Sequence, residues 1–304
     1  MADPLAEVVG LLQPGAGFSK LVEGAGAWRV SRSEAGRPFY CALLEGATRL
    51  TIPGLPPLLL EAGDFVLIPA AHDFAMDSLA AGPGAGPAVA DSLPVELRPG
   101  VYRIGDAEGP ASLRSMVGYC SFGSGDTALL LSLLPKLVHV RGVGRLLTLV
   151  QLVDDESRAA RPGREVVLQR LLEVLLIEAL RATAGPAAPS GLLRGLADDR
   201  VAVALRQMHG SPTAAWTVPQ LARLAALSRS AFFDRFRRVV GVTPMDYLLH
   251  WRMALAKDLL RRGAAGIAET ASRVGYSSAS TFSTAFARHV GLPPGAYARR
   301  QAAE

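Results

Sequence analysis

Two groups of side chains in this sequence have the chemistry of a functional site. The first group is Cys41, His72 and Cys120, whose thiols and imidazole are zinc ligands and whose thiols can also undergo redox reactions. Either chemistry requires a fold that brings the three side chains together. The alternative is structural, with two small buried thiols and an imidazole that closes a turn.

The second group consists of polar and charged side chains that follow two serines fifty residues apart, Ser228 and Ser278. After the first serine come Arg229, Ser230, Phe233, Asp234, Arg237 and Arg238, and after the second come Ser280, Thr281, Ser283 and Thr284. Guanidinium groups bind phosphate oxygens, whereas hydroxyls, carboxylates and apolar rings can contact the edges of bases. This second group therefore has the chemistry of a nucleic-acid surface.

The elements that would carry this second group are repeated in the sequence. The residues Phe232, Phe236, Gly241, Pro244 and Tyr247 recur fifty positions later as Phe282, Phe286, Gly291, Pro294 and Tyr297. In each copy a serine can cap a helix, aromatic residues at helical spacing give it an apolar face, and a glycine ends it. A shorter apolar helix is expected before each copy, so each copy predicts a helix-turn-helix, whose second helix can enter a major groove.

This region resembles the DNA-binding domain of the AraC/XylS family of bacterial transcription regulators. The resemblance covers about residues 195–300 and rests on SRSAFFDRFRRVVGVTPMDYL, WRMALAKDLL and IAETASRVGYSSASTFSTAFARHVGLPPGAY. It implies two helix-turn-helix units, joined by one long helix, that read neighbouring major-groove segments of double-stranded DNA. Half-sites one helical turn apart, about 34–36 Å, suit this arrangement. RNA polymerase would be a further partner if the protein activates transcription.

The family pattern also implies roles for individual residues. It places Ser230, Phe233 and Asp234 at base-contacting positions, where Asp234 could accept from a cytosine amine. The alternative for Asp234 is a local ion pair with Arg237 or Arg238. Phosphate contacts are expected from Arg229, Arg235, Arg237 and Arg238. The hydroxyls of the second copy cannot form the bidentate pairs that discriminate best between bases, so we expect the first unit to carry most specificity and the second mainly to anchor.

The charge of the chain is unevenly distributed. Residues 192–304 carry 16 Lys and Arg against 7 Asp and Glu, a net charge of +9, whereas residues 1–191 have a net charge of −4. A basic segment beside a more acidic one is typical of a nucleic-acid-binding module. No run of 18 uncharged apolar residues occurs, and the N-terminus is acidic, so we expect a cytoplasmic protein without a membrane partner.

The first half is expected to form short strands separated by Gly and Pro, as in a β-sandwich or barrel. The expected strands are Trp28–Val30, Phe39–Leu44, Thr48–Ile52, Leu58–Leu60, Phe65–Ile68, Val101–Ile104 and Leu113–Ser121. The segment LLLEAGDFVLIPAAHDF resembles the second half of a cupin motif, with Gly63, Pro69 and His72 in the family's places. This resemblance implies a cupin-like β-barrel that senses a signal, over residues 1–140.

Metal-binding cupins carry a His-x-His on an earlier strand, and the corresponding segment here, FYCALLEGATRL, lacks it. We therefore expect no required cofactor. A metal ion or a small-molecule effector could still be held in the cupin-like domain by Cys41, His72 and Cys120. A redox-responsive cysteine pair is a further alternative.

Between the two regions the pattern is helical, and the whole chain is expected to be an α+β multidomain protein. In residues 141–183, the segments Gly144–Glu156 and Arg164–Arg181 are amphipathic, and the second is too broadly apolar for one partner. The family resemblance makes this a dimerisation segment, so we expect a homodimer; a helix in the core of a monomer is the alternative. Residues 184–194 are expected to be a linker, residues 195–304 the DNA-binding domain, and residues 79–96 a surface loop.

Two functions are compatible with these features of the sequence. The first is a sequence-specific, non-enzymatic DNA-binding regulator controlled by a signal in the cupin-like domain. The second is a cupin-type metalloenzyme with an appended DNA-binding module. The missing His-x-His argues against the enzyme, and the basic, duplicated C-terminal region favours the regulator.

Overall fold

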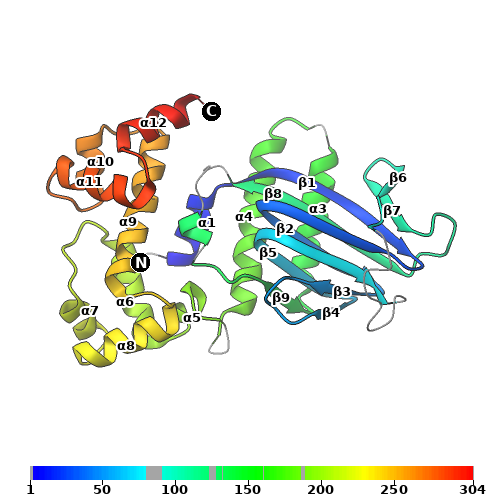
Figure 1. Ribbon diagram of the computed structural model, residues 1–304, viewed down its shortest axis with the longest axis horizontal. Helices are drawn as coiled ribbons and strands as arrows, with labels where there is room; N and C mark the ends of the chain where they lie inside the picture. Colours follow the sequence, from blue (N-terminus) through cyan, green and yellow to red (C-terminus); the bar gives the residue numbers. More distant parts are fainter. Residues whose placement is uncertain are drawn as a thin grey trace. The chain divides into compact units, whose positions relative to one another are not determined.

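The computed structural model describes residues 3–79, 91–122, 128–131, 133–159, 161–185 and 189–303, without the side chains of residues 16, 17, 34–36, 72, 128, 129 and 303. The chain divides into two compact units (Figure 1). The sheet unit comprises residues 13–123 and 136–183, and the helical unit comprises residues 1–12, 124–135 and 184–304. Residues 1–12 and 124–135 therefore belong to the helical unit, whereas the sequence analysis placed both segments in the cupin-like domain of residues 1–140.

The sheet unit contains one nine-stranded sheet with the order β4-β3-β5-β2-β8-β1-β7-β6, in which β9 also pairs with β5. Its strands are β1 (Pro14–Ala25), β2 (Arg29–Glu45), β3 (Ala47–Thr51), β4 (Leu58–Glu61), β5 (Asp64–Ser78), β6 (Val95–Arg98), β7 (Val101–Gly105), β8 (Leu113–Phe122) and β9 (Val138–Arg141). The β1–β7 pair is parallel, and the other pairs are antiparallel.

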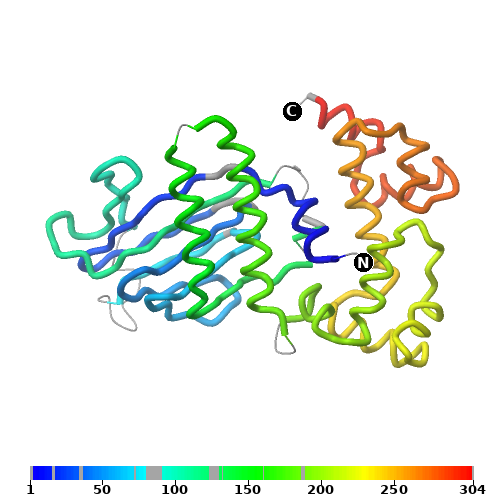
Figure 2. Tube along the Cα trace, turned by 180° about the vertical axis from the view of Figure 1, so that it is seen from behind, coloured from blue at the N-terminus to red at the C-terminus, as the bar shows by residue number. Residues whose placement is uncertain are grey.

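The sheet is open in the described residues, because β4 and β6 end it on either side. The closed cupin-like barrel expected from sequence is therefore not found. Two helices, α3 (Gly144–Arg158) and α4 (Arg164–Thr183), cover one face of the sheet (Figures 1 and 2). They bury apolar residues such as Leu149, Leu172 and Leu176, so the sheet gains a covered face by helix packing rather than by closing on itself.

The opposite face of the sheet carries a second apolar layer. Its largest members include Trp28, Phe39, Phe74, Leu43 and Leu113, all at most 5% exposed. These residues come from β2, β5 and β8 and from the turn before β2. Both faces of the sheet are therefore apolar, which explains why its strands do not alternate cleanly between apolar and polar residues.

The strands are longer and more numerous than the sequence predicted. Strand β2 joins two of the expected strands into one, and β1 lies in a Gly- and Ala-rich stretch for which no element was expected. Strand β9 lies in a stretch for which no strand was expected. Its burial alternates along the strand, and it pairs with Asp64–Leu67 of β5.

The helical unit is built around the long helix α9 (Pro244–Arg261). Two helix pairs, α7 with α8 and α10 with α11, lie at opposite ends of α9 (Figures 1 and 2). The other described helices of the unit are α1 (Pro4–Leu12), α2 (Ala128–Leu131), α5 (Leu192–Leu196), α6 (Asp199–Gly210), α7 (Val218–Leu224), α8 (Arg229–Val240), α10 (Ile267–Arg273), α11 (Ala279–Val290) and α12 (Pro294–Ala303). Within the described residues, no helix is both long and apolar enough to cross a membrane.

Side chains cap the starts of two of these helices, α6 and α7. The Asp198 carboxylate accepts from the backbone N–H groups of Arg200 and Val201 at the start of α6, and Thr217 forms a capping box with Gln220 at the start of α7. Each cap satisfies backbone donors that the first turn of a helix leaves unpaired. Local sequence signals therefore determine where the helices of this unit begin.

Candidate nucleic-acid interface

The helix α8 has the features of a groove-reading helix. Its first turn is capped by Ser228, whose Oγ accepts from the N–H of Ala231 at 3.2 Å. Phe232 and Phe236 are completely buried on one side, and Gly241 ends the helix with a left-handed φ of 90°. Because one side is fixed in the core, the opposite side of α8 is held toward solvent.

The helix α11 repeats this construction closely. Ser278 accepts from the N–H of Thr281 at 3.2 Å, and Gly291 ends the helix with a φ of 84°. The rings of Phe282 and Phe286 are 5.5 Å apart, compared with 5.7 Å for Phe232 and Phe236. The sequence repeat is therefore also a structural repeat.

A tyrosine that follows each of these helices, Tyr247 and Tyr297, fixes it to the next helix. The ring of Phe236 meets Tyr247 of α9 edge-on at 5.9 Å and 74°. The ring of Phe286 meets Tyr297 of α12 at 5.6 Å and 72°. Such edge-to-face pairs stabilise aromatic cores beyond simple burial, so both helices are presented rigidly.

On α8, the predicted contact residues lie on the outward side. The side chains of Arg229, Ser230, Asp234, Arg237 and Arg238 are exposed, and Phe233 is half-buried. In the part of the chain that the structure describes, no ion pair joins Asp234 to Arg237 or Arg238. The local pairing considered for Asp234 therefore does not form, and its carboxylate faces outward beside uncommitted guanidinium groups.

Two arginines of the helical unit, Arg235 and Arg252, have partners within the protein. The Nε of Arg235 donates to both oxygens of Asp198, at 2.8 and 3.1 Å. The guanidinium of Arg252 donates to the carbonyls of Pro212 and Ala214, at 2.8 and 2.9 Å. Arg235 therefore fixes α8 to the start of α6, and Arg252 fixes α9 to the loop before α7. Sequence periodicity identifies outward positions but does not reveal such partners.

On α11, the predicted residues are hydroxyls that already serve the helix. Ser283 donates to the carbonyl of Ala279 at 2.7 Å, and Thr284 donates to that of Ser280 at 3.1 Å. Ser280 shares a 2.7 Å hydrogen bond with Ser278, and Thr281 donates to the same serine. A hydroxyl that already donates its proton within the helix has only lone pairs left to offer. Phosphate oxygens are hydrogen-bond acceptors, so they cannot bind such a hydroxyl.

The structure does not bring the two cysteines together. Cys41 lies opposite Val117 in the β2–β8 pair, so these two side chains share one face of the sheet. Cys120 is three residues further along β8 and therefore points to the other face. Burial raises the pKa of each thiol to about 12, so both stay protonated and unreactive at neutral pH.

The third member of the proposed metal set, His72, lies in β5, but its side chain is outside the described residues. Among the described residues, no cluster of three or more His, Cys, Asp or Glu is arranged to hold a metal ion. A thiol pair divided between two faces of a sheet does not fit a shared metal or a disulfide.

A buried polar contact in the helical unit was missed by the sequence analysis. The Nδ1 of His209 lies 2.8 Å from an oxygen of Glu7, and its Nε2 lies 2.7 Å from the hydroxyl of Tyr247. The imidazole also stacks on Trp251, with ring centroids 3.9 Å apart. Burial lowers the pKa of His209, although the nearby Glu7 carboxylate opposes this effect. The sequence separation of 202 residues between Glu7 and His209 leaves no local signal for this contact.

Comparison with known proteins agrees with this geometry. A family model described as a cupin matches residues 3–185, and one described as a helix-turn-helix domain matches residues 221–300. A protein of Streptomyces lividans named as an AraC-like transcription regulator is 35% identical over 303 residues, which cover 97% of each chain. The chain belongs to the AraC-like transcription regulators. A second such regulator, from Streptomyces antibioticus, is also 35% identical and covers 97% of this chain and 98% of its own.

Among solved structures, the DNA-binding domain of AdpA in complex with a target DNA is 29% identical, with a TM-score of 0.33. It covers 35% of this chain and 95% of its own. The two family models and the Streptomyces relatives show that the present chain is a DNA-binding transcription regulator with a β-rich N-terminal domain and a helical C-terminal domain. The expected functional class is confirmed.

Proposed function

We propose that both helix pairs are helix-turn-helix units and that the protein binds a specific DNA sequence through α8 and α11. The observation that carries this proposal is the repeated geometry of the two helices, each with two buried phenylalanines and an outward polar side. Because both pairs contact the same long helix α9, their spacing is fixed, which suits two successive major-groove segments.

The two helices are proposed to divide their roles. Asp234 and Ser230 of α8 are exposed, and a carboxylate can accept from a cytosine amine. On α11, the hydroxyl protons of Ser283 and Thr284 are donated to carbonyl groups within the helix. We therefore assign most base discrimination to α8. The exposed Arg229, Arg237 and Arg238 supply phosphate contacts.

Site-directed variants test this division. Ser230→Ala and Asp234→Ala should each change the base preference measured on a panel of single-base variants of a selected binding site. Ser280→Ala and Thr284→Ala should change that base preference little, because their hydroxyl hydrogen bonds are made within the protein. Ser272→Ala on α10, an exposed serine outside both recognition helices, is the matched control. A larger loss of preference in the α11 variants than in the α8 variants would contradict the assignment.

The sheet unit is proposed to form a homodimer through its helices. Exposed apolar side chains occur on the outer sides of α3 and α4, where Leu152, Val166, Val167 and Val174 are between 38% and 62% exposed. Clusters of this kind often mark association surfaces. Sedimentation velocity should give a dimer for the full chain and a monomer for the Val167→Lys/Val174→Lys variant. Arg206→Ala in the helical unit should leave the dimer unchanged.

The sheet unit is also proposed to sense the signal that controls DNA binding, and the chain is proposed to have no catalytic role. The alternative of a cupin-type metalloenzyme makes a distinct prediction. Purified enzyme would carry stoichiometric iron or manganese and would turn over a small substrate. Metal analysis of the purified full chain should instead give well below one equivalent of either metal.

A further inference from the structure

The sheet unit contains a hollow on the face of the sheet opposite α3 and α4. Its apolar walls include Trp28, Phe39, Phe74 and Ile104. The space open to the centre of a water-sized sphere is about 60 Å³, and all the empty space in the hollow, including open solvent at its mouth, is about 540 Å³. A water needs roughly 10–15 Å³ by the first measure, so the hollow takes a group of roughly four to six non-hydrogen atoms.

Two cations lie beside this apolar hollow without a carboxylate. Lys20 of β1 and Arg32 of β2 are the charged residues of its lining, and the lining contains no acidic residue. In the described part of the chain, neither forms an ion pair. Burial and the positive charge of Arg32 lower the pKa of Lys20. Two like charges that are half-buried together are unfavourable unless an anion neutralises them.

The local structure holds these cations at the hollow. Strand β8 lies between β1 and β2, and Lys20 stands opposite Val117, which itself stands opposite Cys41. Lys20 therefore points to the same face as the apolar wall. Its Nζ lies 4.6 Å from the ring centroid of Tyr102 and 5.2 Å from that of Phe18, which keeps the ammonium among apolar groups. The Arg32 Nη1 donates to the carbonyl of Ser31 and leaves further donors free.

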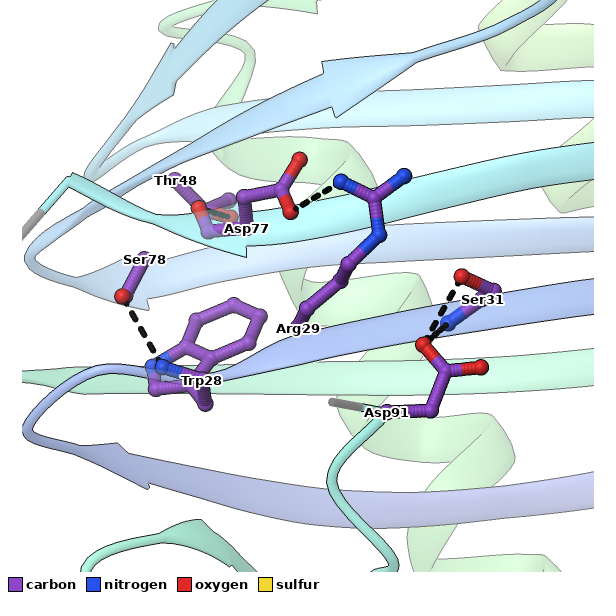
Figure 3. Close-up of polar contacts among 7 residues, drawn as sticks. All are labelled: Trp28, Arg29, Ser31, Thr48, Asp77, Ser78 and Asp91. Atoms are coloured by element: carbon purple, nitrogen blue, oxygen red, sulfur yellow. Dashed lines mark hydrogen bonds and ion pairs between the residues drawn. The ribbon is translucent and has the colours of Figure 1, made fainter. Parts of the chain in front are cut away.

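The indole of Trp28 forms part of the apolar wall. Trp28 is 2% exposed, and its backbone N–H donates to Ser78 Oγ at 3.0 Å (Figure 3). Its Nε1 lies against Gly24 of β1, where an added Cβ would be 2.6 Å away. The ring is therefore held on the sheet as a fixed apolar surface for a ligand.

The segment that begins at Asp91 is attached to the same region. Ser31 donates to the Asp91 carboxylate from both its backbone N–H and its hydroxyl, at 3.2 and 2.8 Å (Figure 3). The N–H of Ser92 donates to the carbonyl of Arg29, and Pro94 lines the hollow. These bonds fix one wall of the hollow, so a ligand would meet a largely formed site.

We propose that this hollow binds a small organic carboxylate, with an aliphatic or aromatic body against the apolar wall and the carboxylate between Lys20 and Arg32. The volume of the hollow favours carboxylates with a short apolar body, such as hexanoate or benzoate, over those with long acyl chains. The charges exclude cationic ligands, and the apolar wall disfavours sugars and inorganic phosphate. This inference rests on the proposed function in one respect, that the sheet unit is the part that senses a signal.

Calorimetric titration of the full-length protein tests the inference. Hexanoate and benzoate should each bind at least tenfold more tightly than 1-hexanol and benzyl alcohol, which share their bodies but lack the charge. Lys20→Met and Arg32→Met should each weaken carboxylate binding at least tenfold and leave alcohol binding within about twofold. Val117→Phe, which adds bulk to the wall, should weaken both. Arg98→Met, at an exposed position of β6, is the matched control.

The inference is overturned if the alcohols bind as tightly as the acids, if the two charge variants bind as well as the unchanged protein, or if neither acid binds at about 10 mM. Melting curves of each variant establish that a loss of binding is not a loss of folding. The same preparations should be tested for DNA binding. Specific DNA binding without carboxylate binding would overturn this inference and leave the proposed function intact. Carboxylate binding without specific DNA binding would overturn the proposed function and leave the carboxylate site intact.

Discussion

The side chain of Arg235 is bound to Asp198, with its Nε 2.8 Å from Oδ2 and 3.1 Å from Oδ1. Asp198 is also the N-cap of α6. One carboxylate thus joins the recognition helix α8 to a helix of the supporting core. Hydrogen bonds from these donors outweigh the effect of burial and lower the pKa of Asp198. Arg235 therefore positions α8 through its Nε.

Replacing Arg235 should affect stability more than recognition. Since the Arg235 side chain is 39% exposed, Arg235→Ala should cost only about 1 kcal/mol of unfolding free energy. It should leave base preference unchanged. Arg237→Ala should instead leave stability within about 0.5 kcal/mol and reduce the slope of log affinity against log salt by about 1. Urea unfolding and salt-dependent DNA titration measure the two effects; equal salt slopes for both variants would contradict the distinction.

The buried carboxylate of Asp64 should make the sheet unit sensitive to acid. Burial alone would raise its pKa, but hydrogen bonds from Arg141, the Glu61 N–H and His139 lower that pKa to about 2. The stabilisation is therefore complete above the unfolded pKa of about 3.9 and is lost as the pH falls toward 2. Asp64→Asn should cost about 2 kcal/mol at pH 7, with a difference that shrinks below pH ~4.

Unfolding of the sheet unit by urea, measured between pH 2 and pH 7, tests this prediction. Asp73→Asn is the matched control, because Asp73 lies on the same strand β5 and is exposed. The control should change the unfolding free energy by less than about 0.5 kcal/mol across the range. A difference between Asp64→Asn and the unchanged protein that grows at low pH would show the sign to be wrong.

His209 should give the helical unit the same direction of pH dependence in a different range. Burial lowers its pKa below the usual 6.5, so the unfolded chain binds more protons than the folded one below that pH. Stability should therefore fall as the pH drops from 6.5 through the lowered folded pKa. His209→Gln should flatten this dependence, as measured by urea unfolding between pH 5 and pH 8.

A second variant separates the roles of burial and charge at His209. Glu7→Gln keeps a hydrogen-bond acceptor but removes the negative charge that opposes burial. The loss of stability should then extend to lower pH than in the unchanged protein. If Glu7→Gln instead flattens the curve in the same way as His209→Gln, the carboxylate rather than the imidazole is the titrating group.

Gly291 at the end of α11 should be required only because its backbone conformation is left-handed. Gly291 has a φ of 84°, and a Cβ added there would meet no atom within 4 Å. Gly291→Ala should therefore cost about 1 kcal/mol, all of it from the backbone. Gly10→Ala in the last turn of α1, where a Cβ also has free space, should change stability in the opposite direction by about 0.5–1 kcal/mol. Thermal unfolding of the two variants would test whether the signs differ.

The helical unit was the easier part to predict from sequence. Its helices begin at Thr217, Ser228 and Ser278 because capping is a local interaction between a side chain and the next turn. The buried pairs of phenylalanines follow helical spacing. What the sequence did not reveal were the partners of Arg235 and Arg252, because both lie nearly forty residues away along the chain.

The sheet unit was harder, because both faces of its sheet are buried. The alternation of apolar and polar residues then disappears from the sequence, and the strand at Val138–Arg141, which is β9, was not predicted. The relation between Cys41 and Cys120 also depends on register, which sequence does not give. A shift of one residue in the β2–β8 pair would place both thiols on one face.

The helix α1 has a practical consequence for dissecting this protein. It precedes the sheet in sequence but packs on α6 and α9, where Leu5, Val8, Val9 and Leu12 are at most 6% exposed. A recombinant fragment that starts near residue 184 would lack α1 and would expose apolar side chains of α6 and α9 to solvent. Cutting the gene at one point therefore cannot yield an intact C-terminal half; the first dozen codons have to be grafted back or supplied as a separate peptide.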